Sequence, residues 1–244
     1  PPPKNGAPSV FQLTLVPPAD VARAQRPRDV VFVLDRSGSM SGWKTVAARR
    51  ALGRMLDTLS PQDRFNVLSF DDRIEPLPGH AASALVEATN RNRYRAIEHL
   101  SGVDARGGTE MAQPLRQAAD ALSGGYQDRD RWIVLVTDGQ VGNEDQILRD
   151  LGSRIKNVRI FTVGIDRAVN EGFLRRLSEL GGGGTELVES EDRLDEVMDR
   201  VHRAIDSPVL TELSIELEEA QDEARFDIAF DGTFVADETK HHSP

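Results

Sequence analysis

Three oxygen-bearing side chains stand at alternate positions on one short segment of this 244-residue sequence. Asp35, Ser37 and Ser39 directly follow an apolar run, residues 30–34, that is typical of a buried β-strand. The spacing places one carboxylate and two hydroxyls on a single loop, and Gly38 allows that loop to turn sharply. By itself such a loop is a weak signal, because Ser and Gly after a strand are ordinary turn formers.

Two more oxygen donors occur where other elements begin or end. Thr109 follows a Gly-Gly pair and precedes the helical pattern of residues 111–122, and Asp138 follows the apolar run 132–136. In a parallel sheet these points meet at the carboxyl edge, so the five side chains are expected to converge. Two carboxylates and three hydroxyls suit a hard divalent cation, Mg²⁺ first, with Mn²⁺ or Ca²⁺ as alternatives. Thr109 can also serve as the N-cap of that helix, and the two roles are compatible.

The elements that must position these residues alternate between strand and helix. Short apolar strand patterns occur at residues 30–34, 65–70, 132–136, 158–163 and 185–188, the last after a tight Gly-rich turn at 181–184. Helical patterns occur at residues 43–59, 94–100, 111–122, 147–155, 173–180 and 194–205. This alternation predicts an α/β fold, with a doubly wound, mostly parallel central sheet flanked by helices.

The flanks of the sequence differ from this core. Residues 9–16 have a strand pattern within a flanking segment and linker, 1–28, and residues 210–217 and 224–235 alternate apolar and polar side chains as half-buried strands do. The expected organisation is therefore the α/β domain at 29–206, a C-terminal β flank at 207–237 and a disordered tail at 238–244. The two flanks together are expected to form a small β-rich appendage.

Composition excludes several classes of function. The sequence has no cysteine, so disulfides, thiolate metal sites and cysteine nucleophiles are absent, and the compartment stays open. The formal net charge of −10 argues against nucleic acid and anionic membrane surfaces as partners. No apolar run approaches the roughly twenty residues of a transmembrane helix.

The order Asp-x-Ser-x-Ser, Gly-Gly-Thr, Thr-Asp-Gly resembles the metal-ion-dependent adhesion site of von Willebrand factor A domains, over about residues 30–205. The resemblance implies direct metal ligands at Ser37, Ser39 and Thr109, with Asp35 and Asp138 acting largely through water. The segments 31–35 and 59–66 are further similar to inter-α-trypsin inhibitor heavy chains and their bacterial relatives. That family implies a β-rich domain upstream in the same chain, which is a candidate partner, and slightly favours an extracellular or cell-surface location.

A binding function follows from the charge of such a site. An inner shell of hydroxyl and water leaves the cation under-compensated, so it stays attractive to an Asp or Glu carboxylate of a protein partner. Met40 and Trp43, beside the metal loop, are candidate partner contacts, although Trp43 can instead pack at its helix start. Asp71 and Asp72 follow the strand at 65–70 and either line the same rim or form a solvated turn.

Two other functions compete with metal-dependent binding. The first is a structural scaffold that docks to a neighbouring domain without metal. The second is a Mg²⁺-dependent phosphohydrolase with Asp35 as nucleophile, but that chemistry usually needs a second acid at the position of Ser37 and a phosphate-binding Lys. Lys44 and Lys156 are the candidates for such a lysine, and neither makes a convincing motif. We therefore expect a binding module and no enzyme.

Overall fold

The computed structural model describes residues 26–124, 128–139, 141–155, 157–194, 196–197, 200–201, 213–219 and 224–230. The chain divides into two units, residues 25–206 and the flanks 1–24 with 207–244. Of the second unit the structure describes an antiparallel pair, β8 (Leu213–Glu219) and β9 (Ala224–Phe230). The strand expected at 9–16 and the tail at 238–244 lie outside the described residues, and the expected domain limits stay a prediction.

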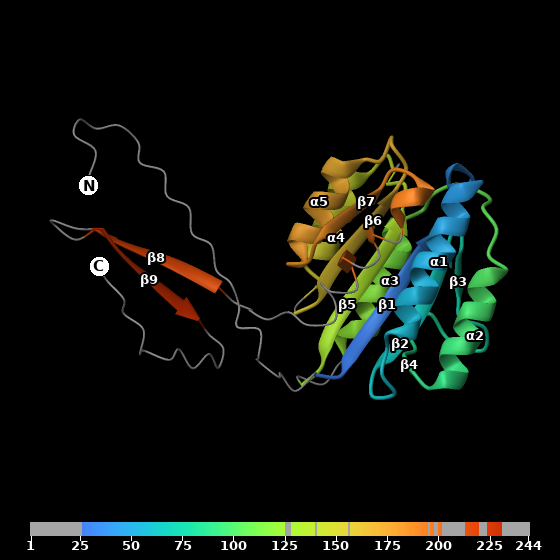
Figure 1. Cartoon of the computed structure of the whole chain (residues 1–244), viewed down its shortest axis with the longest axis horizontal. Coiled ribbons are helices and arrows are strands. Elements are labelled where there is room, and N and C mark those ends of the chain that lie inside the picture. The colour runs from blue at the N-terminus through green and yellow to red at the C-terminus, as the bar shows by residue number, and fades with distance from the viewer. Residues whose placement is uncertain are drawn as a thin grey trace. The chain divides into compact units, whose positions relative to one another are not determined.

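The unit 25–206 is built on one mixed sheet (Figure 1). Its strands run in the order β3-β2-β1-β5-β6-β7, with β4 also paired to β2. Their bounds are β1 Arg28–Asp35, β2 Arg64–Phe70, β3 Ile74–Pro76, β4 Val86–Glu87, β5 Asp130–Thr137, β6 Arg159–Ile165 and β7 Thr185–Val188. β2, β1, β5, β6 and β7 are parallel, whereas β3 and β4 pair antiparallel with β2. The expected mostly parallel sheet is therefore confirmed.

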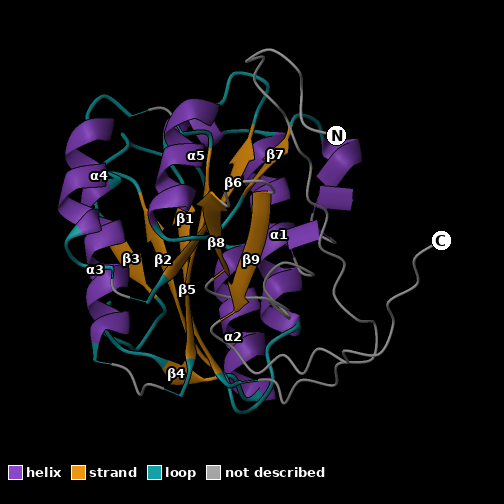
Figure 2. Cartoon of the chain, turned by 90° about the vertical axis from the view of Figure 1, so that its left-hand side faces the viewer, coloured by secondary structure: helices purple, strands orange, loops and turns teal. Residues whose placement is uncertain are grey.

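Helices cover both faces of this sheet (Figure 2). They are α1 Trp43–Asp57, α2 Asn90–Ser101, α3 Ala112–Ser123, α4 Glu144–Gly152 and α5 Glu171–Leu180, with further helical residues at 194, 196–197 and 200–201. Alternate strand residues face two separate cores, as the two-residue period of a strand requires. Phe32 and Val134 pack with α1 and α2, while Val33 and Leu135 pack with α3, α4 and α5. None of the helices in these described parts is long and apolar enough to cross a membrane.

The winding of the chain reverses beside β1. From β1 the chain moves through α1 to β2, and after α3 it returns to the other side of β1 as β5, followed by β6 and β7. The register places Asp35 beside Phe70 of β2, and Leu34 beside Val136 of β5. The loops after β1, β2 and β5 therefore leave the sheet at one edge, next to the topological switch point where doubly wound sheets bind ligands.

In the expected Gly-rich turn before β7, the backbone passes close to the backbone at the start of β6. Gly182 has a positive φ of 63°, and Gly183 donates its backbone N–H to Ser178 O at 2.9 Å. A Cβ on Gly183 would lie 1.9 Å from the carbonyl oxygen of Ile160, at the start of β6. This turn therefore has room for a glycine only.

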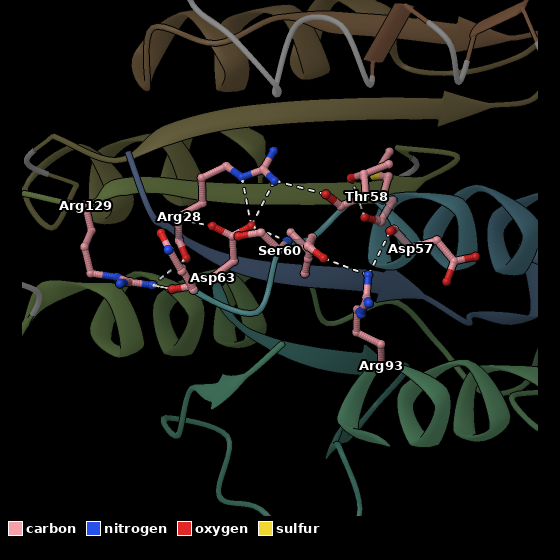
Figure 3. Close-up of polar contacts among 10 residues, drawn as sticks. Arg28, Asp57, Thr58, Ser60, Asp63, Arg93 and Arg129 are labelled. Atoms are coloured by element: carbon pink, nitrogen blue, oxygen red, sulfur yellow. Dashed lines mark hydrogen bonds and ion pairs between the residues drawn. The ribbon is translucent and has the colours of Figure 1, made fainter. Parts of the chain in front are cut away.

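Buried charges hold the opposite, amino-terminal edge of the sheet together (Figure 3). Asp63 Oδ1 accepts the backbone N–H of Arg28 at 2.7 Å, and its Oδ2 accepts Arg28 Nη2 at 2.9 Å and Ser60 N at 2.7 Å. Asp29, 1% exposed, accepts from Arg129 Nε at 2.7 Å and Arg64 Nη2 at 2.5 Å. These contacts join the starts of β1, β2 and β5.

Candidate metal centre

Asp35, the last residue of β1, is held in one orientation by both of its carboxylate oxygens. Oδ1 accepts the backbone N–H of Ser37 at 2.8 Å, and Oδ2 accepts the Thr137 hydroxyl at 2.6 Å. Thr137, at the end of β5, accepts in turn from Gly139 N at 2.8 Å. The carboxylate of Asp35 therefore links the loops that leave two adjacent strands.

The two serines of the loop after β1 lie together. Ser37 Oγ and Ser39 Oγ are 3.0 Å apart, in a loop that continues as a short 3₁₀ turn, Gly38–Met40. Ser37 is 1% exposed, whereas Ser39 is exposed, so the hydroxyl pair leads from the interior to solvent. The alternate spacing thus places these two hydroxyls side by side.

Asp138 follows directly after β5 and is fully buried. Burial raises the pKa of Asp35 above its usual value, although the hydrogen bonds from Thr137 and Ser37 oppose this, and the negative charge of Asp138 raises it further. Two carboxyl groups that are buried close enough to repel each other favour a cation at this place, since a positive charge would relieve both.

The segment that carries Thr109 is tied to the loop of Asp35. Gly38 N donates to Gly107 O at 3.1 Å, and Arg106 N donates to Arg36 O at 2.6 Å. Gly107 has a positive φ of 71°, so it adopts a conformation that other residues rarely take. Thr109, partly exposed, follows two residues later and lies just before α3.

Asp71, after β2, is a buried hub between these two segments. Its Oδ2 lies 3.1 Å from Arg36 Nε and 3.0 Å from Arg106 Nε, and its carbonyl accepts Glu110 N at 3.0 Å. Desolvation alone would raise the pKa of the Asp71 carboxyl, but the hydrogen bond from Arg106 and the contacts with Arg73 and Arg36 hold that pKa below its usual value. Asp71 therefore positions the Thr109 segment against the Asp35 loop.

We expect Asp71→Asn to loosen this junction without unfolding the chain. The amide keeps the shape of the side chain but removes one of the two carboxylates that pair with the buried Arg36 and leaves Glu75 as the other, a loss of about 1–3 kcal/mol. Hydrogen exchange at the amides of Gly38 and Glu110 should become faster. The matched control is Asp72→Asn, because Asp72 is exposed and accepts the backbone N–H of Gly108 at 3.1 Å. Equal exchange rates in the two variants would contradict the role of Asp71 in joining the Thr109 segment to the Asp35 loop.

From the sequence, Thr137 and Asp166 had no assigned role at this edge, and Lys44 was considered only as a candidate phosphate-binding lysine. Lys44 Nζ lies 2.9 Å from Asp166 Oδ2, after β6, and 3.4 Å from Asp138 Oδ2. Burial alone would lower the pKa of the Lys44 ammonium, but the hydrogen bond and charge of Asp166 and the charge of Asp138 raise it. The signal for Asp166 was its place at the end of the strand next to β5. Lys44 is the second residue of α1, which follows the Asp35 loop, and its type and position alone gave no such signal.

The expected partner rim needs correction at two residues. Met40 is 0% exposed in the core with α1 and α2, and Asp71 is 5% exposed, so neither side chain forms part of an exposed rim. Trp43 is partly buried and packs against the same core at the start of α1. Asp72 is exposed beside Gly107 and Gly108. Met40 is the last residue of the 3₁₀ turn, and its apolar side chain belongs to the core with α1 and α2.

The donors at this edge fit a hard cation. Two buried carboxylates lie beside a hydroxyl pair, and Thr109 stands on a segment tied to the same loop. Over the described ranges, no three His, Cys, Asp or Glu side chains form a cluster that could hold a metal. A cation at this edge would therefore depend on serine and threonine hydroxyls, which suits Mg²⁺ or Mn²⁺ better than a soft metal.

This fold and this arrangement of loops are those of one class of domain. The family model of the von Willebrand factor type A domain matches residues 28–187, and the chain belongs to that family. Domains of this family typically mediate protein–protein interaction, often with a divalent cation.

Two groups of relatives are similar in sequence. Human inter-alpha-trypsin inhibitor heavy chain H4 is 29% identical over 202 residues, which are 78% of this chain and 21% of that protein. The rat voltage-dependent calcium channel subunit alpha-2/delta-3 is 30% identical over 177 residues, which are 66% of this chain and 16% of that protein. The chain thus spans a minor part of the length of these relatives.

Solved structures share the fold. A von Willebrand factor type A protein from Catenulispora acidiphila superposes with a TM-score of 0.67 at 22% identity, over 79% of this chain and 46% of that one. Proximal thread matrix protein 1 from the mussel byssus, with a zinc-occupied MIDAS motif, gives a TM-score of 0.56 at 15% identity, over 72% of this chain and 47% of that one. The expected doubly wound fold is confirmed.

Proposed function

We propose that this domain binds a divalent cation through Asp35, Ser37, Ser39, Thr109 and Asp138, and binds a partner protein through that cation. Mg²⁺ is the proposed cation, with Mn²⁺ or Ca²⁺ as alternatives. The observation that carries the proposal is the pair of buried carboxyl groups, Asp35 and Asp138, beside the Ser37–Ser39 hydroxyl pair.

The bound cation would supply an electrophilic position for a carboxylate of the partner. The residues of the chain support that role by their graded exposure: Asp35 and Asp138 are buried, Ser37 is buried at the loop base, and Ser39 and Thr109 lead to solvent. An Asp or Glu side chain could therefore approach from the side of the hydroxyls. The relatives' domains, which belong to the same family, support a binding function in general terms.

The arrangement of Asp35 weighs against phosphohydrolase chemistry. A nucleophilic carboxylate must reach its substrate, but Asp35 is 1% exposed, and both of its oxygens accept hydrogen bonds from Ser37 and Thr137. Those contacts suit an orienting role. We therefore propose a binding module and no enzyme.

Metal binding is tested with the metal alone. Thermal unfolding is measured in EDTA and in millimolar Mn²⁺ or Mg²⁺ for the wild type, Ser37→Ala and Asp138→Ala. A ligand of the native state raises stability by about 2.7 kcal/mol at a hundredfold excess over its Kd. The wild type should show this rise in melting temperature, and both variants should lose it.

The matched control is Ser41→Ala on the same loop. Ser41 is exposed and donates its hydroxyl to Gly38 O at 2.6 Å, so it is not among the proposed ligands. It should keep the metal-dependent rise. No rise in the wild type, or a full rise in Ser37→Ala, would overturn the proposal and favour a scaffold that needs no metal. A protein partner captured by the immobilised domain should be released by EDTA and should not bind Ser37→Ala.

A further inference from the structure

Lys44 occupies an unfavourable place for a positive charge. It is the second residue of α1, and the amino end of a helix carries partial positive charge, so cations there are disfavoured. No acidic residue stands in that first turn. The charge is instead balanced across the loops, by Asp166 at 2.9 Å and Asp138 at 3.4 Å. The position therefore depends on contacts with the ends of β5 and β6.

This ion pair belongs to a largely desolvated part of the molecule. The side chain of Lys44 is 13% exposed, that of Asp138 is 0% exposed and that of Asp166 is 29% exposed. Solvent screens such charges less than it screens charges on the open surface. A fixed ammonium here must affect any cation that uses Asp138.

We propose that Lys44 determines the ligand preference of the metal centre by withholding part of the negative charge of Asp138 from the cation. The inference rests on the proposed function, because it concerns the same site. Lys44 then acts as a specificity-determining residue: it weakens the hold on the metal and keeps the loaded site attractive to an anionic partner.

The formal charges give the direction of both effects. Asp35, Asp138 and Asp166 carry three negative charges, which a divalent cation and one ammonium balance in full. With Lys44 present, the loaded site is neutral when a carboxylate arrives. Without it, the loaded site is already negative, so it holds the cation more firmly and repels a carboxylate.

A purely structural role for Lys44 predicts a different pattern. If the lysine only ties α1 to the ends of β5 and β6, then removal of either partner loosens the site, and both Lys44→Met and Asp166→Asn weaken metal binding. The electrostatic role predicts opposite signs, because one variant removes a positive charge and the other a negative charge. Asp166→Asn also leaves Lys44 free to move toward Asp138, which strengthens its expected effect.

The experiment is a calorimetric titration with Mn²⁺ alone at fixed ionic strength. We expect Lys44→Met to lower the Kd for Mn²⁺ about tenfold and Asp166→Asn to raise it about as much, the scale of one unit charge near a divalent ion. Lys44→Arg keeps the charge and should stay near the wild type. Arg50→Met is the matched control, because it removes one positive charge from the exposed face of the same helix.

A second readout follows the anionic ligand. With Mn²⁺ bound, the relaxation of acetate protons reports binding of a carboxylate, and Lys44→Met should bind acetate several times more weakly than the wild type. A Kd for Mn²⁺ that is unchanged or higher in Lys44→Met, while the wild type binds and Ser37→Ala does not, would overturn this inference alone. If neither the wild type nor Lys44→Met binds Mn²⁺, both the inference and the proposed function are overturned.

Discussion

Asp63→Asn is expected to lower the free energy of unfolding by about 3–5 kcal/mol at neutral pH, the usual cost of breaking one side of a buried ion pair. The side chains of Arg28 and Asp63 are 8% and 2% exposed, and Asp63 also accepts the backbone N–H of Arg28 and of Ser60. The substitution keeps the shape of the side chain but removes the negative charge that faces the buried guanidinium of Arg28. Chemical denaturation in EDTA measures the change.

The same pair gives a pH dependence with a defined sign. Desolvation alone would raise the pKa of Asp63, but the hydrogen bonds and charge of Arg28, with the Ser60 N–H, bring it below the ordinary value of 3.8. A carboxyl whose pKa is lowered by folding stabilises the protein above its unfolded pKa and loses that contribution as pH falls through its folded pKa. The gap between wild type and Asp63→Asn should therefore be full near neutral pH and shrink in acid below 3.8.

An exposed ion pair supplies the control for this prediction. Asp120 and Arg154 lie 2.9 Å apart with side chains 55% and 45% exposed, and such pairs contribute about 0–1 kcal/mol. Asp120→Asn should thus change stability little. If it costs as much as Asp63→Asn, then the effect comes from net charge and not from the buried pair.

Gly183→Ala should cost about 3 kcal/mol or more, at the upper end of overpacking effects. The added Cβ would lie 1.9 Å from Ile160 O and 2.6 Å from Ile160 C, and both are backbone atoms that cannot rotate away. The start of β6 or the turn before β7 must therefore shift. Thermal unfolding of the variant measures the loss.

Gly53→Ala is the matched control and has the opposite expected sign. Gly53 lies inside α1, and nothing stands within 4 Å of a Cβ added there. Alanine in a helix interior stabilises by about 0.5–1 kcal/mol relative to glycine. A stable Gly183→Ala variant would show that the turn is not as tightly packed as the structure has it.

The fold was largely predictable because its strands are apolar on both faces. Residues 30–34, 65–70, 132–136 and 158–163 all lie within observed strands or begin one residue before them. The short strands β3 and β4 were missed, since two or three residues at the edge of a sheet produce no period. The antiparallel pairing of Ser69 with Glu75 depends on tertiary contact and leaves no local pattern.

The sequence predicted that the proposed ligand residues lie at one edge of the sheet, but it did not predict the residues that position them. The strand-end rule predicted Asp35 and Asp138 at one edge of the sheet, and the structure adds that the strands they follow, β1 and β5, are adjacent. The roles of Thr137 and Lys44 depend on side-chain direction across loops, which sequence spacing does not specify. Asp71 was expected at the surface, either on the partner rim or in a solvated turn. In the structure its carboxylate pairs with Arg36 and Arg106, and these ion pairs compensate its burial.

The first and last described residues of the 25–206 unit lie away from the carboxyl edge. β1 starts at Arg28 on the opposite edge, and the last described helical residues run back from the end of β7, with Arg200 at 2.9 Å from Glu186. Tension applied between these two ends would not pass through the loops at Asp35 and Asp138. A partner that pulls on those loops would instead apply force along the axis of β1. The hydrogen bonds of β1 to β2 and to β5 would then resist that force together.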